Sequence, residues 1–191
     1  MEHGMPEWGL TEDQRRIRQS VLDLLEKVLP RSQIMKLDEA EQFPAEAYRA
    51  LADAGWMGLP FPEEHGGMAL GYKDLTIMIE TLAYYWNGIS SSYLTTVVLG
   101  GGHIKLYGNE AQKARFIPKI ISGDLKLAFA LTEPQAGSSP ADMRTMAVKK
   151  GDRYVLNGEK IYITNAGPAH VFTVMAITDK SKGIKGISAF V

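Results

Sequence analysis

The hydrophobic pattern of the chain changes its period once, near Gly123, and this change constrains the fold more than any other feature. Before Gly123, apolar residues recur at helical spacing. The segment from Thr11 to Pro30 shows one such stripe, formed by Ile17, Val21, Leu24, Leu25 and Val28. After Gly123, short runs rich in Val, Ile, Thr, Tyr and Phe alternate with turn residues, as strands do. We therefore predict an α+β fold, with an all-helical N-terminal domain over residues 1–122 and a β-domain over residues 123–191.

Capping and breaking residues divide the first half into five expected helices. Thr11 and Gln14 have the spacing of a capping box, and Pro30 should end the helix that they begin. Asn109 and Gln112 repeat the capping pattern further along. The first expected helix runs from Thr11 until Pro30 stops it, and the others cover residues 44–54, 75–86, 90–107 and 109–123.

Five apolar runs in the second half are predicted strands: "KLAFALT", "RTMAVKK", "RYVLNGEKIYIT", "HVFTVMAIT" and "GISAFV". The pair Asn157-Gly158 inside the third run favours a hairpin, because a type I′ turn needs positive φ at both central residues. Short strands separated by turns favour an antiparallel sheet that curls into a barrel or sandwich. The last run ends the sequence in mid-pattern, so we expect this β-domain to be incomplete.

Composition excludes several function classes. The formal net charge is -1, with Lys and Arg spread along the chain, so no nucleic-acid partner is expected. No apolar run approaches the roughly 20 residues that span a bilayer, and the first residues lack the apolar core of a secretory signal. The absence of cysteine excludes disulfides and thiolate nucleophiles, and a cytoplasmic location is expected. His3, His65, His103 and His170 show no ligand spacing, so no metal is expected.

The stretch "LAFALTEPQAGSSPADMRT" raises the question of function, because a buried strand gives way abruptly to hydroxyls and small residues. The loop Ala136–Ser139 has two interpretations. It is either an ordinary turn at the end of a strand, or a cradle whose backbone amides can approach an anion closely. The chain contains neither G-x-G-x-x-G nor the P-loop pattern, so any nucleotide would be held in another way.

Four segments together resemble the acyl-CoA dehydrogenase flavoprotein family. They are "PEEHGG" from Pro62, "YGNEAQKARFIPKIISG" from Tyr107, "FALTEPQAGSS" from Phe129 and "LNGEKIYITNAG" from Leu156. Their order and spacing match the family over nearly the whole chain. The resemblance implies the family's helical N-terminal domain and the start of its middle β-domain, without its C-terminal domain.

The resemblance also implies where FAD would bind, at the junction of the two domains. The backbone around Phe129 to Leu131 and the Thr132 hydroxyl would face the pyrimidine side of the flavin. Gly137 and Ser138 would lie near the pyrophosphate, and Ser138 also near the pantetheine arm of the substrate. In the second segment the expected contacts are Tyr162 against the flavin rings, Ile163 beside it and the Thr164 hydroxyl near N5. We expect strand alternation to place Tyr162 and Thr164 on one face. Ser139 stands where the family usually has Asp, which puts the loop at Ser138 in doubt.

The activity implied is α,β-dehydrogenation of an acyl-CoA thioester, with electron-transfer flavoprotein as electron acceptor and a homo-oligomeric full-length enzyme. The family's catalytic base is a Glu of the C-terminal domain, so no catalytic residue is assigned here and the chain is expected to be an N-terminal fragment, inactive alone. The alternatives are an acyl-CoA oxidase or flavin monooxygenase of the same fold, or a short homologue that binds flavin or acyl-CoA without catalysis. Glu133 is expected to shape the turn, and Gly100-Gly101-Gly102-His103 either to serve close helix packing or to leave room for an acyl chain beside Ser92 and Thr95.

Overall fold

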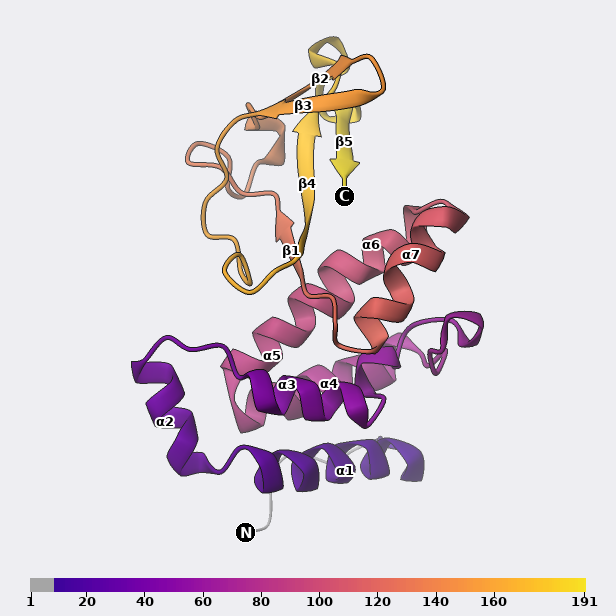
Figure 1. The fold of residues 1–191 in the computed structure, drawn as a ribbon, viewed down its shortest axis with the longest axis vertical. Helices are drawn as coiled ribbons and strands as arrows, with labels where there is room; N and C mark the ends of the chain where they lie inside the picture. Colours follow the sequence, from indigo (N-terminus) through magenta and orange to yellow (C-terminus); the bar gives the residue numbers. More distant parts are fainter. Residues whose placement is uncertain (1–8) are drawn as a thin grey trace.

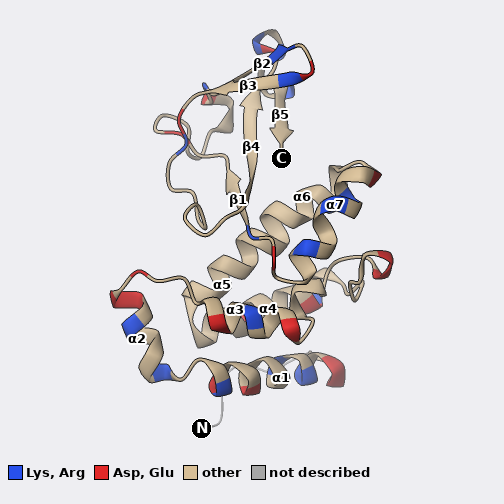
Figure 2. Ribbon diagram, in the orientation of Figure 1, with Lys and Arg blue, Asp and Glu red and all other residues tan. Residues whose placement is uncertain are grey.

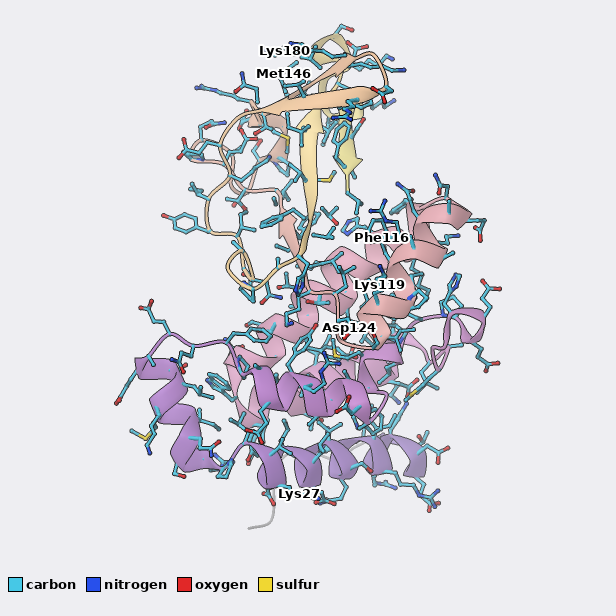
Figure 3. The ribbon with its side chains drawn as sticks, viewed as in Figure 1. Lys27, Phe116, Lys119, Asp124, Met146 and Lys180 are labelled. Atoms are coloured by element: carbon cyan, nitrogen blue, oxygen red, sulfur yellow. The ribbon has the colours of Figure 1, made fainter. Side chains whose placement is uncertain are left out.

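The computed structural model describes residues 9–191, and it places the helices at one end of the molecule and the β-sheet at the other (Figure 1). The short linker that joins them contains Asp124, which lies between the last helix and the first strand (Figure 3). Arg49 holds this linker, because its guanidinium donates to the Ser122 carbonyl at 2.7 Å and to Asp124 at 3.0 Å. The observed order of helices and then strands confirms the predicted α+β class.

The first helix, α1 (Glu12–Val28), begins and ends as its sequence predicts. The Thr11 hydroxyl accepts from the Gln14 N–H at 3.2 Å, and the Gln14 side chain accepts from the Thr11 N–H at 3.1 Å. A second helix, α2 (Arg31–Glu39), was not expected. It has no side-chain cap and buries none of its residues, so its sequence carries neither of the signals used to find helices.

The other helices of this half are α3 (Ala45–Asp53), α4 (Tyr72–Tyr85), α5 (Asn87–Tyr93), α6 (Gly101–Tyr107) and α7 (Glu110–Ile121), with 3-10 turns η1 (Trp56–Gly58) and η2 (Glu63–His65). The expected helix over residues 90–107 is realised as α5, a π-helical stretch η3 (Leu94–Gly100) and α6 in succession. This helix packs on the sheet, and a Cβ at Gly100 would lie 2.5 Å from the Cβ of Leu127. Gly100 therefore permits close contact between helix and strand, as expected for packing glycines.

The sheet has the order β1-β4-β2-β3, and β5 pairs antiparallel with residues 174–177 of β4. Its strands are β1 (Leu127–Ala130), β2 (Met146–Lys150), β3 (Arg153–Asn157), β4 (Val171–Ile177) and β5 (Ile187–Phe190), with 3-10 turns η4 (Pro140–Asp142) and η5 (Lys180–Gly186). The sheet is open, as the incomplete pattern predicts. It is mixed rather than purely antiparallel, which corrects the predicted pairing. β4 runs parallel to β1, and its last residue, Ile177, pairs in parallel with Met146 at the start of β2. β1 and β4 are parallel because both start at the junction with the helices (Figure 1).

The predicted hairpin at Asn157-Gly158 is wrong. The hairpin of β2 and β3 turns instead at Gly151 and Asp152, and Asn157 pairs with Met146 at its far end. Beyond Asn157 the chain leaves the sheet and descends as a loop to the helices before it enters β4 (Figure 1). The reason is the backbone of Tyr162 and Asn165, whose φ angles of 55° and 65° are incompatible with a strand.

Charges of both signs are interspersed over both ends of the molecule (Figure 2). Among the described residues, no helix is long and apolar enough to cross a bilayer. In the same part of the chain, no cluster of three or more His, Asp or Glu side chains is arranged to hold a metal ion.

Candidate flavin-facing site

The first segment of the site begins where β1 leaves the core. Leu127, Ala128 and Ala130 are buried, and the chain then folds into a tight turn in which Glu133 and Ala136 exchange backbone hydrogen bonds at 3.1 and 3.0 Å. Gly137, Ser138 and Ser139 follow as an exposed run. Their N–H groups find no partner within the described residues, and a Cβ at Gly137 would meet nothing within 4 Å. The N–H groups of residues 137–139 are therefore available to donate hydrogen bonds to a ligand.

The second segment is the loop between β3 and β4, residues 158–170, and is called the second loop below. Its geometry corrects one inference from the sequence. Residues 161–164 form no strand, so strand alternation does not place Tyr162 and Thr164 on one face. Tyr162 has a φ of 55°, and its side chain is 89% exposed. Thr164 is also exposed, and its hydroxyl makes no hydrogen bond within the described part of the chain.

Three hydrogen bonds join these segments, which lie about thirty residues apart in the sequence. The Ile161 N–H donates to the Thr132 carbonyl at 3.0 Å. The ammonium of Lys160 donates to the Leu131 carbonyl at 2.9 Å and to Glu133 Oε1 at 2.7 Å. The end of β1 and the start of the second loop are therefore held side by side.

Glu133 is the centre of this arrangement. Its side chain is 2% exposed and accepts from Lys160, from the N–H groups of Arg144 and Thr145, and from the Gln135 side chain. Burial raises the pKa of this carboxyl, but the hydrogen bonds, led by that of Lys160, outweigh burial and lower the pKa to about 2. Glu133 is thus a fully ionised structural anion, in agreement with its expected role in shaping the turn, and is unsuited to accept a proton in catalysis.

The second loop is also tied to the helices. The Asn165 side-chain amide donates to the Ser92 carbonyl at 3.1 Å, and to Thr96 Oγ1 and the Leu127 carbonyl at 3.3 Å each. The ring of Phe129 stacks on that of His103 in α6, with centroids 4.8 Å apart and an interplanar angle of 9°. The Phe129 ring therefore faces the helices, which leaves only its backbone for the cofactor contact expected there.

A cavity of about 530 Å³ opens beside the second loop. Its walls come from the α2–α3 connection, from α5 and from residues 163–168, and they include Phe43, Trp86, Ser92, Ile163 and Asn165. Neither Thr132 nor Thr164 lines it. A smaller cavity of about 190 Å³ lies between α4 and the η3–α6 helix, with Phe61, Leu75 and Val97 among its walls.

Of the predicted site residues, Leu131 and Thr132 are brought directly against the loop that carries Tyr162, Ile163 and Thr164. Gly137 and Ser138 lie on the open side of the turn and make no contact with that loop through a hydrogen bond. The sequence reasoning did not single out Lys160 or Asn165. Both are polar residues inside "LNGEKIYITNAG". Only the fold shows that Lys160 pairs with Glu133 and that Asn165 donates to Ser92 in the helices.

Comparison with known proteins accounts for both halves of the chain. Residues 11–124 match the family profile described as acyl-CoA dehydrogenase, N-terminal domain, and residues 128–191 match the profile for the middle domain of the same family. The short-chain specific acyl-CoA dehydrogenase of Clostridium acetobutylicum is 37% identical over 186 residues, which are 97% of this chain and 48% of that protein. Subunit CarC of the caffeyl-CoA reductase-Etf complex of Acetobacterium woodii is 39% identical over 182 residues, which are 95% of this chain and 48% of that protein.

Solved structures give the same result. Butyryl-CoA dehydrogenase from Megasphaera elsdenii superposes with a TM-score of 0.87 at 35% identity, over 97% of this chain and 49% of that one. An FAD complex of PigA superposes with a TM-score of 0.85 at 29% identity, over 97% of this chain and 49% of that one. The chain thus spans about half the length of the relatives it matches.

Proposed function

Because the chain belongs to the acyl-CoA dehydrogenase family, we propose that it forms the FAD-facing and acyl-CoA-facing part of an enzyme that dehydrogenates acyl-CoA thioesters. The relatives whose names include acyl-CoA dehydrogenase or butyryl-CoA dehydrogenase match both halves of this chain. Solved members of the family include FAD complexes, which supports FAD as the cofactor.

The observation that carries the proposal is the direct joining of the two segments by the Ile161–Thr132 and Lys160–Leu131 hydrogen bonds. The two segments carry groups that have no partner among the described residues. These are the N–H groups of Gly137 to Ser139 and the hydroxyls of Ser138 and Thr164, and the ring of Tyr162 is exposed as well. Amide donors suit a pyrophosphate, and a flat aromatic ring suits a flavin, so the donor set fits FAD.

In this proposal, bound FAD supplies the hydride acceptor at its N5 atom. The Thr164 hydroxyl would donate a hydrogen bond toward N5 and so favour the negative charge that the flavin takes up. The Thr132 hydroxyl and the backbone from Phe129 to Leu131 would hold the pyrimidine side, and Ile163 would contact the ring. Gly137 and Ser138 would hold the pyrophosphate, and Ser138 would also contact the pantetheine arm of the thioester.

The α-proton needs a base, and no residue of this chain is assigned that role. Glu133 is ionised, buried and committed to four donors. The family profiles that match are those of the N-terminal and middle domains, and the resemblance places the base in neither. We therefore propose that the chain positions the cofactor and substrate, while the base comes from a further domain.

Electron-transfer flavoprotein is the proposed electron acceptor, supported by the relative that is named as a subunit of a complex with Etf. Reaction of the reduced flavin with oxygen would instead make the protein an oxidase or monooxygenase of the same fold. The cytoplasmic location and the homo-oligomeric state expected from the sequence stay predictions.

The direct test is titration of the purified chain with FAD, followed by visible absorbance and by quenching of flavin fluorescence. We expect saturable binding that Tyr162→Leu weakens. Tyr72→Leu is the matched control, because Tyr72 is also largely exposed, at 73%, but lies at the start of α4. A folded chain that leaves FAD unbound at every concentration would contradict the proposed cradle and favour a homologue without flavin chemistry.

Substrate class is tested next with CoA thioesters of graded acyl length added to the FAD-loaded protein. Binding should perturb the flavin spectrum for the thioesters that fit. In a protein that also carries the base, the flavin should bleach on mixing. Reoxidation by air would identify an oxidase, whereas stability in air with reoxidation by electron-transfer flavoprotein would identify a dehydrogenase.

A further inference from the structure

Thr164 lies on a loop that is anchored on both sides of it, and neither anchor is Thr164 itself. On one side the Ile161 N–H donates to the Thr132 carbonyl at 3.0 Å. On the other side the Asn165 amide reaches Ser92, Thr96 and Leu127. The Thr164 hydroxyl has no hydrogen bond of its own among the described residues, so its position is set by the residues around it.

The Asn165 anchor is unusual because it spans both parts of the molecule. Its Nδ2 atom carries two hydrogens and lies within 3.1 to 3.3 Å of three acceptors, which belong to α5, to η3 and to β1. Thr96 Oγ1 is in turn the acceptor for the Leu127 N–H at 3.3 Å. One side chain thus closes a small network between the helix, the first strand and the second loop.

The helix that contains Ser92 changes from α-helical to π-helical spacing close to the Asn165 contact. Ser92 lies in the last turn of α5, directly before the chain adopts π-helical spacing at Leu94. Short π-helical stretches are rare and often mark functional positions. Ser92 also lines the cavity of about 530 Å³ together with Asn165, so the anchored helix and the anchored loop form facing walls of one space.

The backbone of Asn165 adds a second requirement. Its φ of 65° lies in the left-handed region, which Gly, Asn and Asp adopt most easily. The position also requires a donor that reaches two carbonyls. Gly satisfies the backbone but supplies no donor, and Asp satisfies the backbone but presents an acceptor to the Ser92 and Leu127 carbonyls. Asn alone of the three meets both requirements.

We propose that Asn165 is a positioning residue that locks the second loop to the α5–η3 helix and so fixes the Thr164 hydroxyl relative to the helical wall of the site. This inference rests on the proposed function, since it is the flavin contact of Thr164 that gives the lock its purpose. Loss of the lock should leave the core intact, because Asn165 lies outside the buried cluster that holds the helices together.

The test compares Asn165→Asp and Asn165→Gly with Asn87→Asp, a control that introduces the same charge at the exposed first residue of α5. Hydrogen exchange of the chain without FAD, followed by mass spectrometry, should show faster exchange in residues 159–167 for both Asn165 variants and unchanged exchange in α1, α3 and α4. The control should exchange like the wild type throughout.

The second readout is the visible circular dichroism of FAD at saturation, which reports the orientation of the ring rather than the amount bound. Both Asn165 variants should change this signal and raise the FAD dissociation constant about three- to tenfold, the effect of losing the one hydrogen bond that a correctly placed Thr164 would make to the flavin. A merely structural residue would lower the unfolding temperature without changing the spectrum of the flavin that remains bound.

Wild-type exchange in residues 159–167 together with a wild-type flavin signal would overturn the proposal. Unfolding of both variants would also overturn it, because Asn165 would then be a stability residue. If the wild-type chain fails to bind FAD, the proposed function is wrong, and the exchange experiment alone still decides whether Asn165 locks the loop.

Discussion

The ammonium nitrogen of Lys160 lies 2.7 Å from Oε1 of Glu133, and the two side chains are only 12% and 2% exposed. This ion pair connects the turn after β1 with the loop that leads to β4, which are the two segments proposed to face the flavin. Buried pairs cost desolvation energy, but the loss of one partner costs more because it leaves the other charge unpaired. The stability and the geometry of the site therefore depend on the same contact.

The first prediction concerns the pH dependence of stability. The pKa of Glu133 falls from its ordinary 4.5 to about 2 in the folded chain, so between these values the unfolded state binds more protons. The stability that Glu133 contributes is thus complete above about pH 4.5 and is lost as the pH falls toward 2. A shift of this size corresponds to about 3 kcal/mol. Urea unfolding measured from pH 2.5 to 6 should show this slope.

Glu133→Gln should flatten the slope, because the variant has no carboxyl to protonate. Glu110→Gln is the matched control, since Glu110 also pairs with a lysine but is 81% exposed. Its removal should leave the slope unchanged, as expected for a surface pair. A slope that survives Glu133→Gln would show that other carboxyls produce it.

The second prediction concerns the pair itself. Lys160→Met should destabilise the chain at pH 7 by about 3 kcal/mol, because it leaves the Glu133 carboxylate buried without its cation. The double variant Glu133→Gln/Lys160→Met should lose about 1–3 kcal/mol less than the sum of the single variants, since it leaves no charge unpaired. Chemical unfolding of all four proteins measures the coupling. Strict additivity would mean that the two side chains act independently.

The third prediction compares two glycines of the site. A Cβ at Gly158 would lie 2.2 Å from Thr145 Oγ1 and 2.6 Å from Thr145 Cα, whereas a Cβ at Gly137 would meet nothing within 4 Å. Gly158→Ala should therefore lower the free energy of unfolding by about 1–3 kcal/mol through overpacking. Gly137→Ala should leave stability within about 0.5 kcal/mol of the wild type.

The same two variants separate folding from binding. Gly137→Ala should still weaken FAD binding, because its methyl group would occupy the open approach to the Gly137–Ser139 amides. Thermal unfolding and FAD titration of each variant provide the two measurements. Full FAD affinity in Gly137→Ala would argue against a pyrophosphate at this turn.

Local sequence signals predicted the features of the fold that depend on neighbouring residues. The capping box of Thr11 and Gln14 positions α1, and the strand that contains Leu127 follows from its apolar run. The missed helix α2 has neither a cap nor a buried stripe, so its sequence gives no local sign of it. Asn157-Gly158 has the composition of a hairpin turn, but Gly158 instead permits the close approach of Thr145.

The site was only partly predictable for a related reason. The resemblance drew attention to Thr132 and Thr164, but the contacts that hold their segments together run between residues far apart in sequence. Lys160 reaches Glu133, and Asn165 reaches Ser92, across 27 and 73 positions respectively. The left-handed backbone at Tyr162 was hidden as well, because tyrosine rarely adopts it and the surrounding "KIYIT" has the composition of a strand.

The last prediction tests the assignment of Thr164 to flavin N5. Thr164→Val keeps the shape of the side chain and removes only the hydroxyl, which is exposed and has no partner in the described chain. The unfolding temperature should therefore change little. The FAD dissociation constant should rise about three- to tenfold, in keeping with about 0.5–1.5 kcal/mol for one hydrogen bond, and chemical reduction of the bound flavin should become harder. Thr76→Val, at an exposed position of α4, should change neither flavin property. If Thr164→Val lowers only the thermal stability and leaves FAD affinity and reduction intact, the Thr164 hydroxyl does not act on N5, and the second loop contributes to the cofactor through Tyr162 and its backbone instead.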